Sequence, residues 1–328
     1  MKEALPNAVV LLVGFVAGIS SWIFFRRFLL RPYLRVKKDS AGQKGNGYGP
    51  WSIGVYEGAT PFQISEPAGT RNPVLSGRDV NDRDARFVAD PFMVHAQGRF
   101  YLFFEALERK SNRGAIAVAE SHDGKNWKYQ GVVIEENFHL SYPYVFTDNG
   151  NYYLVPESAE DLSVRLYRAT HFPDRWEHVA NLLSGYRYLD ASVFRHRDRW
   201  WMFVATGASN VLNLYFSDDL VRGWQPHPLN PVVKRNGHIA RPAGRVIDFD
   251  GKLYRFAQDD DPTYGIQVFA FEITELSETS YEEKIVSENP VVKRTGVGWN
   301  AAGMHTVDVQ KVGDRWLALV DGADRPGW

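Results

Sequence analysis

The sequence has 328 residues, of which 44% are hydrophobic and 14% aromatic, so it can bury a full core in one large domain or two ordinary ones. Its 38 Lys and Arg residues are balanced by 39 Asp and Glu residues, and the net charge of −1 argues against a general nucleic-acid binder, which usually carries a basic surplus. The absence of cysteine excludes disulfides, thiolate metal sites and a cysteine nucleophile.

The first predicted element is an apolar run from Asn7 to Phe25 that contains no charged residue. As a helix rising ~1.5 Å per residue it nearly spans a hydrocarbon layer of about 30 Å, so we predict a single transmembrane helix. A cleaved signal peptide is the alternative, but it needs a basic start and a small-residue cleavage site. Lys2 is offset by Glu3 and the run ends in bulky aromatic residues, which favours an uncleaved anchor.

A run of basic residues follows directly and ends at Lys38. Because positively charged flanks stay in the cytoplasm, we expect a single-pass membrane protein whose folded part lies on the cytoplasmic side. The same residues would contact membrane lipids through their anionic headgroups, although they can also act only as a stop signal. Residues 1–38 are therefore predicted to form a membrane anchor and its basic flank.

Residues 39–49 are rich in glycine and polar residues, which is typical of a flexible linker. From residue 50 onward, short runs rich in β-branched and aromatic residues alternate with turn pairs such as Asp123-Gly124 and Asp250-Gly251. No long amphipathic helical pattern competes with them. We therefore predict an all-β domain over residues 50–328.

The predicted strands repeat at intervals of roughly 50 residues, which is typical of β-propeller blades rather than helical solenoids. Each repeat opens with one strand and continues with a second that ends near a polar residue. The five opening strands contain Asp90-Pro91-Phe92, Tyr142-Pro143-Tyr144, Asp190-Ala191-Ser192, Arg241-Pro242-Ala243 and His305-Thr306-Val307. The fifth repeat ends before its outer strands. We predict that the strand Trp51–Tyr56 completes this blade and closes the ring of a five-bladed β-propeller.

Opening strands line the axis of a propeller, so equivalent polar side chains of the repeats should converge there. On the opening strands these are Asp90, Tyr142, Asp190, Arg241 and His305, and on the second strands Glu105, Glu157, Asp259 and Asp321. Buried charges need a partner or a ligand. Paired carboxylates can supply an acid and a base or nucleophile for glycosyl chemistry, and crowding raises the pKa of one of them. The alternative is that they cap loops and pair with nearby arginines.

Seven segments between about residues 86 and 321 carry a family resemblance: VADPFM, YYLVPES, LDASVF, SDDLVRGWQPHPLNPVV, ARPAGR, YRFAQD and MHTVDV. With them the sequence resembles the amino-terminal propeller domain of the glucosamine inositolphosphorylceramide transferase family and its bacterial relatives. That domain is similar in layout to the five-bladed arabinanase- and invertase-type glycosidases. The resemblance therefore implies a propeller that acts on carbohydrate.

By position, the resemblance implies that Asp90 is the base or nucleophile and that Asp190 orients the sugar and tunes the pKa of the acid. The glycosidases carry their acid on the fourth blade, where this sequence has Arg241. We take Glu157 as the substitute acid and Glu105 as the reserve. An arginine here suits a phosphate or carboxylate on the ligand, as in a nucleotide sugar, a sugar phosphate or an acidic sugar. The alternative is that it neutralises Asp190 or Glu157.

Two aromatic residues, Tyr188 and Trp299, lie just before opening strands and are candidates for stacking on a sugar ring. The nine histidines form no close pair with metal-ligand spacing, so we predict neither a metal nor another cofactor. The predicted substrate-binding set consists of Glu105, Tyr142, Tyr188, Arg241, Asp259, Trp299, His305 and Asp321.

These features predict a membrane-tethered, carbohydrate-active propeller that acts on a glycan, nucleotide sugar or glycolipid precursor by carboxylate-based glycosyl transfer or hydrolysis. The missing fourth-blade acid favours an alternative, a non-catalytic glycan-binding or scaffolding propeller. In plant members of the family a glycosyltransferase domain follows the propeller, and this sequence does not include one. In the alternative we therefore expect a separate glycosyltransferase as the partner.

Overall fold

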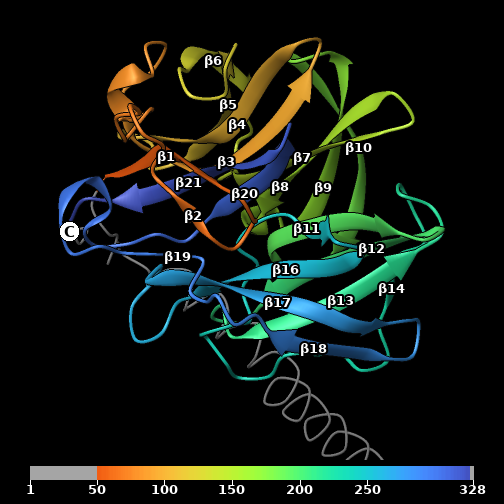
Figure 1. Ribbon diagram of the computed structural model, residues 1–328. Helices are drawn as coiled ribbons and strands as arrows, with labels where there is room; N and C mark the ends of the chain where they lie inside the picture. The colour runs from red at the N-terminus through yellow and green to blue at the C-terminus, as the bar shows by residue number, and fades with distance from the viewer. Residues whose placement is uncertain (1–49, 326–328) are drawn as a thin grey trace, which may run out of the picture. The chain divides into compact units, whose positions relative to one another are not determined.

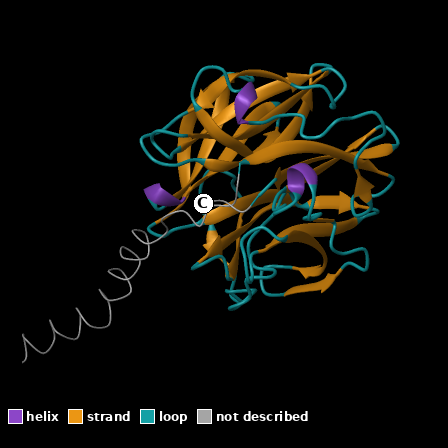
Figure 2. Cartoon of the chain, turned by 90° about the vertical axis from the view of Figure 1, so that its left-hand side faces the viewer, coloured by secondary structure: helices purple, strands orange, loops and turns teal. Residues whose placement is uncertain are grey.

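The computed structural model describes residues 50–325, and this part of the chain is built almost entirely of β-strands. Its strands form five antiparallel sheets, four with four strands and one with five, arranged around a common axis (Figure 1). Within these residues the helical structure consists of three short 3-10 helices, Gly77–Asp79, Ala159–Asp161 and Gly298–Asn300 (Figure 2). The prediction of an all-β, five-bladed β-propeller is confirmed.

In blades 1 to 3, and from β15 to β18 of blade 4, strands that follow one another in the chain pair in order, starting at the axis. Blade 1 consists of β3 (Ala85–Ala96), β4 (Arg99–Glu108), β5 (Gly114–Ser121) and β6 (Lys128–Ile134). Blade 2 consists of β7 (Ser141–Asp148), β8 (Asn151–Ser158), β9 (Ser163–His171) and β10 (Arg175–Ser184). Blade 3 consists of β11 (Leu189–His196), β12 (Arg199–Thr206), β13 (Val211–Ser217) and β14 (Gln225–Pro226). Blade 4 consists of β15 (Ile247–Phe249), β16 (Lys252–Asp259), β17 (Gln267–Leu276), β18 (Tyr281–Ile285) and β19 (Val292–Lys293). Blade 5 consists of β20 (Val307–Val312), β21 (Arg315–Ala323), β1 (Trp51–Gly58) and β2 (Ile64–Ser65).

Blade 5 is built from both ends of the described chain. Its inner strands β20 and β21 come from the C-terminal end, and its outer strands β1 and β2 come from the N-terminal end. β1 pairs with β21 over its whole length, from Trp51 opposite Ala323 to Gly58 opposite Trp316. The ring therefore closes as predicted, and the edge that β21 would otherwise expose is paired.

The first strands of blades 1 to 3 share a local distortion. Asp90, Tyr142 and Asp190 have φ angles of 56°, 44° and 50°, and the register of each strand shifts at this point. Few non-glycine residues adopt this left-handed conformation, so its repetition at equivalent positions marks a bulge that redirects the backbone toward the axis. In these three blades, the repeat interval of roughly 50 residues seen in the sequence is therefore also the spacing of this backbone bulge.

Blades 4 and 5 depart from the predicted strand pattern. The segment 241–243 is not part of β15, and it pairs with β16 only through an isolated bridge between Pro242 and Ala257. Proline has no backbone N–H to donate to a strand ladder. The next residue, Gly244, passes so close to the carbonyl of Val307 that a side chain would not fit. In blade 5, the two predicted residues before Val307 likewise lie outside β20.

Apolar side chains fill the spaces between neighbouring blades. The largest hydrophobic cluster spans blades 1 to 3 and includes Phe92, Leu154 and Met202, which are fully buried. A second cluster joins blades 4 and 5 around Phe256 and Val309. Because the apolar cores lie between blades, the axis is left to polar groups.

A buried ion pair ties four blades together on this axis. Arg245 of blade 4 donates from Nε to Asp308 Oδ1 of blade 5 at 2.5 Å. Its Nη2 donates to the carbonyl oxygens of Met93 in blade 1 and Val145 in blade 2, both at 3.2 Å. Asp308 is fully buried and also accepts a hydrogen bond from the Met93 N–H at 2.7 Å. This pair is a structural centre of the ring.

Within residues 50–325, the structure has no helix that is both long enough and apolar enough to cross a membrane. The predicted transmembrane helix at residues 7–25, its basic flank and the predicted linker lie outside the described residues. The boundaries 1–38, 39–49 and 50–328 stay predictions.

Asp308→Asn should lower the free energy of unfolding by about 3 kcal/mol, because it leaves the Arg245 guanidinium buried without its counter-charge. Urea unfolding of the full chain measures this effect. Asp314→Asn, an exposed change in the turn between β20 and β21, is the matched control and should stay within about 0.5 kcal/mol. Equal stability of Asp308→Asn and the parent chain would contradict the role of this pair.

Candidate functional site

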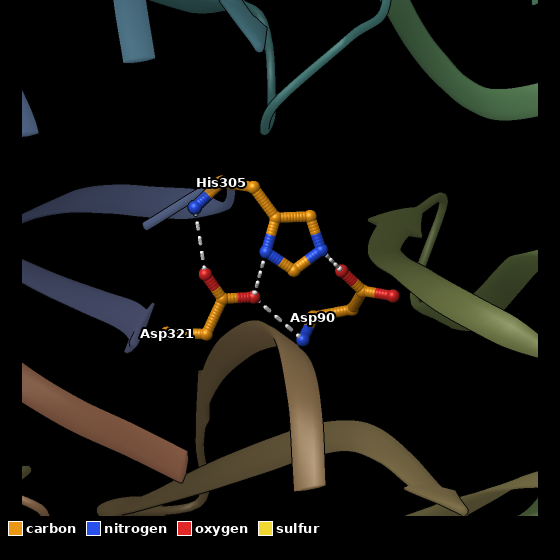
Figure 3. Close-up of side chains that lie close together, drawn as sticks. All are labelled: Asp90, His305 and Asp321. Carbon is orange, nitrogen blue, oxygen red and sulfur yellow. Dashed lines mark hydrogen bonds and ion pairs between the residues drawn. The ribbon is translucent and has the colours of Figure 1, made fainter. Parts of the chain in front are cut away.

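Three side chains predicted from separate strands meet at the centre of the propeller. His305 lies between two carboxylates, with Nε2 3.1 Å from Asp90 Oδ1 and Nδ1 2.9 Å from Asp321 Oδ2 (Figure 3). Asp90 comes from β3 of blade 1, whereas His305 and Asp321 come from blade 5. All three are buried, so their charges depend on one another rather than on water.

Backbone N–H groups hold these carboxylates in place. Asp321 accepts hydrogen bonds from the N–H groups of His305 and Thr306, both at 3.0 Å, and from the N–H of Asp90 at 3.1 Å. Asp90 in turn accepts from the Thr306 hydroxyl at 2.9 Å and from the Tyr142 N–H at 3.1 Å. A carboxylate of one blade thus fixes the backbone bulge of the next blade.

Ion pairing sets the charge state of this group. Burial by itself would lower the pKa of His305, but the carboxylates of Asp321 and Asp90 outweigh burial and hold that pKa well above its ordinary value. Burial likewise opposes ionisation of Asp90, but the hydrogen bond and the charge of His305 keep the pKa of Asp90 below its ordinary value. At neutral pH His305 is therefore a cation and Asp90 an anion.

A second charged group surrounds Arg241. Its guanidinium donates hydrogen bonds to Asp190 Oδ2 at 2.6 Å, to Glu157 Oε2 at 3.2 Å and to the Ser209 hydroxyl at 3.2 Å. Gln258 also donates to Asp190 Oδ2, at 2.6 Å. The guanidinium thus lies within hydrogen-bond distance of both carboxyl groups that the second interpretation named, Asp190 and Glu157, and binding of a ligand anion by Arg241 stays a prediction.

The surroundings of Glu157 shift the pKa of its carboxyl group upward, toward the protonated form. Burial raises its pKa, and the charge of Asp190, which is hydrogen-bonded to it, raises the pKa further. The positive charge of Arg241 offsets only part of this effect, so the pKa of Glu157 stays well above its ordinary value. Of the two carboxyl groups, Glu157 therefore retains a proton more readily than Asp90, whose pKa is lowered.

Glu105 forms a second buried acid, next to a histidine that the sequence pattern does not mark. Burial, followed by the charges of Asp90 and Glu157, raises the pKa of Glu105 well above its ordinary value. Its Oε1 lies 3.4 Å from Nε2 of His139. Because His139 Nδ1 accepts from the Gly114 N–H at 3.0 Å, the ring proton of neutral His139 lies on Nε2. Glu105 Oε1 itself is buried without a hydrogen-bond partner among the described residues. His139 lies in the loop between blades 1 and 2, where no repeat identifies it.

The loop between β16 and β17 contributes two further residues that the sequence analysis missed. The Tyr264 ring lies 5.0 Å from the ring of His305 and 5.4 Å from the guanidinium carbon of Arg241. Burial raises the pKa of Asp260, although the charge of Arg241 partly counteracts this. This loop has no equivalent in the sequence repeat of the blades, so only the fold reveals that it lies near the axis.

Two predicted binding residues reach the axis but are occupied by protein contacts. The Tyr142 hydroxyl is fully buried, donates to the carbonyl of Gly244 at 3.1 Å and lies 3.0 Å from Ser192 Oγ. Asp259 Oδ2 accepts from Gln267 at 2.7 Å. Asp259 Oδ1 lies 2.8 Å from Nδ1 of His238, which is outside the group around Asp90. Binding of substrate by Tyr142 and Asp259 stays a prediction.

The two predicted stacking residues are held by other packing. Trp299 lies against Gly54 and Gly322 of blade 5, and its indole N–H donates to Glu66 at 2.8 Å. Tyr188 packs, half-buried, against the hydrophobic cluster of blades 1 to 3. Their stacking on a sugar also stays a prediction, because position before a first strand does not determine which way a ring faces.

The group around His305 also has the donor set of a cation site. Asp90, His305 and Asp321 offer ligand atoms that all lie within 4.8 Å of one another. Their ion pairs already balance these charges, with the protonated imidazole between the two carboxylates. A metal ion would have to displace that proton, because a histidine ligand must be neutral.

The arrangement as a whole separates protonated from ionised carboxyl groups within one buried cluster. Glu157 and Glu105 can donate a proton, whereas Asp90 can accept one or attack an electrophilic carbon. Such a division between two carboxyl groups is what acid–base or nucleophilic catalysis at a glycosidic carbon requires.

A family model described as "Glucosamine inositolphosphorylceramide transferase 1, N-terminal" matches residues 43–323 of this chain. The chain is 32% identical over 334 residues to glucosamine inositolphosphorylceramide transferase 1 of Arabidopsis thaliana, which covers 94% of this chain and 43% of that protein. It is 31% identical over 331 residues to the protein of the same name from Oryza sativa subsp. japonica, covering 94% and 44%. The chain therefore spans less than half the length of these relatives.

Solved structures similar to this chain include several five-bladed glycosidase-type propellers. A putative glycoside hydrolase from Parabacteroides distasonis has a TM-score of 0.59 at 13% identity, covering 83% of this chain and 100% of that one. A putative glycosidase from Bacteroides thetaiotaomicron has a TM-score of 0.58 at 15% identity, covering 78% and 95%. The α-L-arabinanase of Cellvibrio cellulosa has a TM-score of 0.51 at 13% identity, covering 73% and 95%. At such identities the likeness concerns the fold alone.

Glu105→Gln should make the chain more stable at pH 8, by at least about 1.4 kcal/mol, the equivalent of one pKa unit. Because the pKa of Glu105 is raised on folding, its stabilising effect is complete only below the ordinary value of 4.5 and is lost as the pH rises toward the folded-state pKa. Glutamine cannot ionise, so the advantage of the variant should shrink as the pH falls toward 4.5. Urea midpoints between pH 4.5 and 8 measure this, with Glu108→Gln of the same strand as control. A pH-independent difference would contradict the assignment.

Proposed function

Because this chain belongs to the glucosamine inositolphosphorylceramide transferase family, through that family's N-terminal domain, we propose that its propeller is carbohydrate-active. The proposed ligand is the sugar of a glycan, a nucleotide sugar, a sugar phosphate or a glycolipid precursor, bound at the axial carboxylates. The proposed chemistry is glycosyl transfer or hydrolysis. The family membership supports the substrate class, and the site supports the type of reaction.

One observation carries the proposed reaction: Asp90, whose pKa is lowered, and Glu157, whose pKa is raised, belong to the same buried cluster. Glu157 would protonate the leaving oxygen while the glycosidic C–O bond breaks. Asp90 would activate the acceptor hydroxyl or attack the anomeric carbon. Asp190 would keep the proton on Glu157, since its charge raises the pKa of that acid. Glu105 is the reserve acid.

Arg241 has a supporting role in this proposal. The similar glycosidases carry an acid at the fourth blade, and the arginine takes that position here. Its hydrogen bonds to Asp190, Glu157 and Ser209 occupy three of the guanidinium nitrogens. We therefore propose that it orients the two carboxyl groups, and that an anionic group of the ligand would have to compete with them.

A non-catalytic glycan-binding or scaffolding propeller is the second candidate. One observation favours it, namely that Glu157 and Arg241 are already paired with each other and that their side chains are only 10% and 15% exposed. In that case a separate glycosyltransferase would carry out the chemistry, and the propeller would hold its substrate.

We also propose that the chain is tethered to a membrane, with the propeller on the cytoplasmic side. The apolar run from Asn7 to Phe25 and the basic residues up to Lys38 support this proposal. Substrate attached to a lipid would then be held near the propeller.

Full-length chain in neutral detergent should release sugar from at least one compound in a panel of aryl glycosides and UDP-sugars. Asp90→Asn and Glu157→Gln should each lower kcat/KM by about 100-fold or more, because each removes one half of the acid–base pair. Asp314→Asn, exposed and outside the cluster, should leave it within about twofold. A panel member that raises the Tm of all four proteins without being turned over would favour the binding module instead.

Membrane attachment is tested separately. The full chain should stay in the membrane fraction after a carbonate wash. Leu12→Arg with Val16→Arg should release it, because each arginine costs roughly 2.5–3.5 kcal/mol at the centre of a membrane helix. Trypsin added outside intact cells should leave the propeller uncut, and digestion from that side would contradict the cytoplasmic orientation.

A further inference from the structure

A second recess of the molecule lies beside the junction of blades 1 and 5 and is separate from the axial cluster. It has a volume of about 640 Å³ and is lined by the start of β1, the start of β3 and the turns that follow β4 and β21. Its charged lining consists of Arg78, Arg83, Arg86, Arg109 and Arg325, with Asp84 and Asp324. Five arginines against two aspartates make this arginine groove strongly positive on a chain whose net charge is −1.

Three of the five arginines are exposed, so a ligand can bind their guanidinium groups. Arg78 is exposed, and the side chains of Arg109 and Arg325 are 58% and 65% exposed. Arg109 lies 3.3 Å from Asp84, and Arg325 lies 3.7 Å from its sequence neighbour Asp324. Such exposed pairs contribute little to stability, so an anion in the groove can replace them at small cost.

The fourth arginine, Arg83, is mostly buried in the wall of the groove and is held by an ion pair. Arg83 is only 13% exposed, and its Nη1 and Nη2 bond both oxygens of Glu135, at 3.2 and 3.3 Å. Arg83 is thus held rigidly while the exposed arginines remain adjustable. Planar guanidinium groups with two parallel N–H bonds are well suited to phosphate oxygens.

Trp51 forms the partition between the groove and the axial cluster. It lines the groove, and its ring lies 4.2 Å from the ring of His305. Trp299 lines the groove as well. A group bound by the arginines would therefore lie one indole ring away from the axial carboxylates.

The chain enters the described fold at this groove. Pro50, the first described residue, is one of its lining residues. Only residues 39–49 separate it from the basic flank that ends at Lys38. Even fully extended, these residues reach at most about 40 Å, so a flank at a membrane surface keeps the groove within reach of that surface.

We propose that the arginine groove binds the phosphate of an anionic lipid headgroup. The positive charge and the guanidinium geometry of the groove favour a phosphate as the bound group. The position of Pro50, where the chain from the predicted anchor enters the groove, favours a membrane lipid over a free anion as its source. The choice of a lipid rests on the membrane tether proposed above, whereas recognition of the anion rests on the groove alone.

The test uses the full chain in a neutral detergent, so binding is measured whether or not the tether and the catalytic proposal are correct. Isothermal titration compares dihexanoyl phosphatidylglycerol, dihexanoyl phosphatidylcholine and inorganic phosphate. The test variant is Arg78→Gln with Arg109→Gln. The control is Arg168→Gln with Arg222→Gln, which removes two exposed arginines that pair with Glu177 and Asp219 in other blades.

We expect phosphatidylglycerol to bind more tightly than phosphatidylcholine and than inorganic phosphate. The groove variant should weaken this binding about tenfold or more, the scale of a lost charge-assisted hydrogen bond, and the control should leave it within about twofold. Equal losses in both variants, or no loss in the groove variant, would overturn the site. Inorganic phosphate binding as tightly as phosphatidylglycerol would overturn the lipid source and leave a soluble phosphate as the ligand.

Discussion

Charges buried on the propeller axis must be neutralised across blades, and the rest of the structure depends on this constraint. Asp321 of blade 5 accepts the N–H of Asp90 in blade 1, and Asp90 accepts the N–H of Tyr142 in blade 2. Asp308 joins blade 5 to blade 1 in the same way, through Met93. Because Asp321 and Asp90 satisfy backbone donors at the bulges of blades 1 and 2, these bulges and the ring stabilise each other. Removing one carboxylate would therefore expose both an unpaired donor and an unpaired cation.

The same pairing creates the chemical division within the site. His305 lowers the pKa of Asp90, whereas burial and the neighbouring carboxylates raise the pKa values of Glu157 and Glu105. The pairing that neutralises the charges on the crowded axis thus also separates the pKa values of its carboxyl groups. Asp90 accepts a proton less readily, and Glu157 and Glu105 retain one more readily. Arg241 belongs to this balance, because its guanidinium pairs with both Asp190 and Glu157 and offsets part of the rise in the pKa of Glu157.

Closure of the ring also determines what lies next to the site. The pairing of β1 with β21 brings the first described residues against the last ones and places Trp51 beside His305. The arginine groove on the other side of Trp51 is assembled from the ends of the described chain and from blade 1. A membrane anchor before residue 50 would therefore act on the blade that carries two of the axial residues, not on a remote part of the ring.

The sequence by itself determined the features that repeat locally: strand content, five blades, the closing strand at Trp51 and the axial positions of Asp90 and Asp190. These follow from side-chain periodicity and, in blades 1 to 3, from a backbone bulge at equivalent positions. Tertiary structure alone decided how the charges pair, since Arg241 lies far in the chain from Glu157, and it alone brought His139 and Tyr264 to the cluster from loops without a period. It also decided that Trp299 packs on Gly54 and Gly322, because the direction of a ring in an irregular segment depends on its neighbours in space.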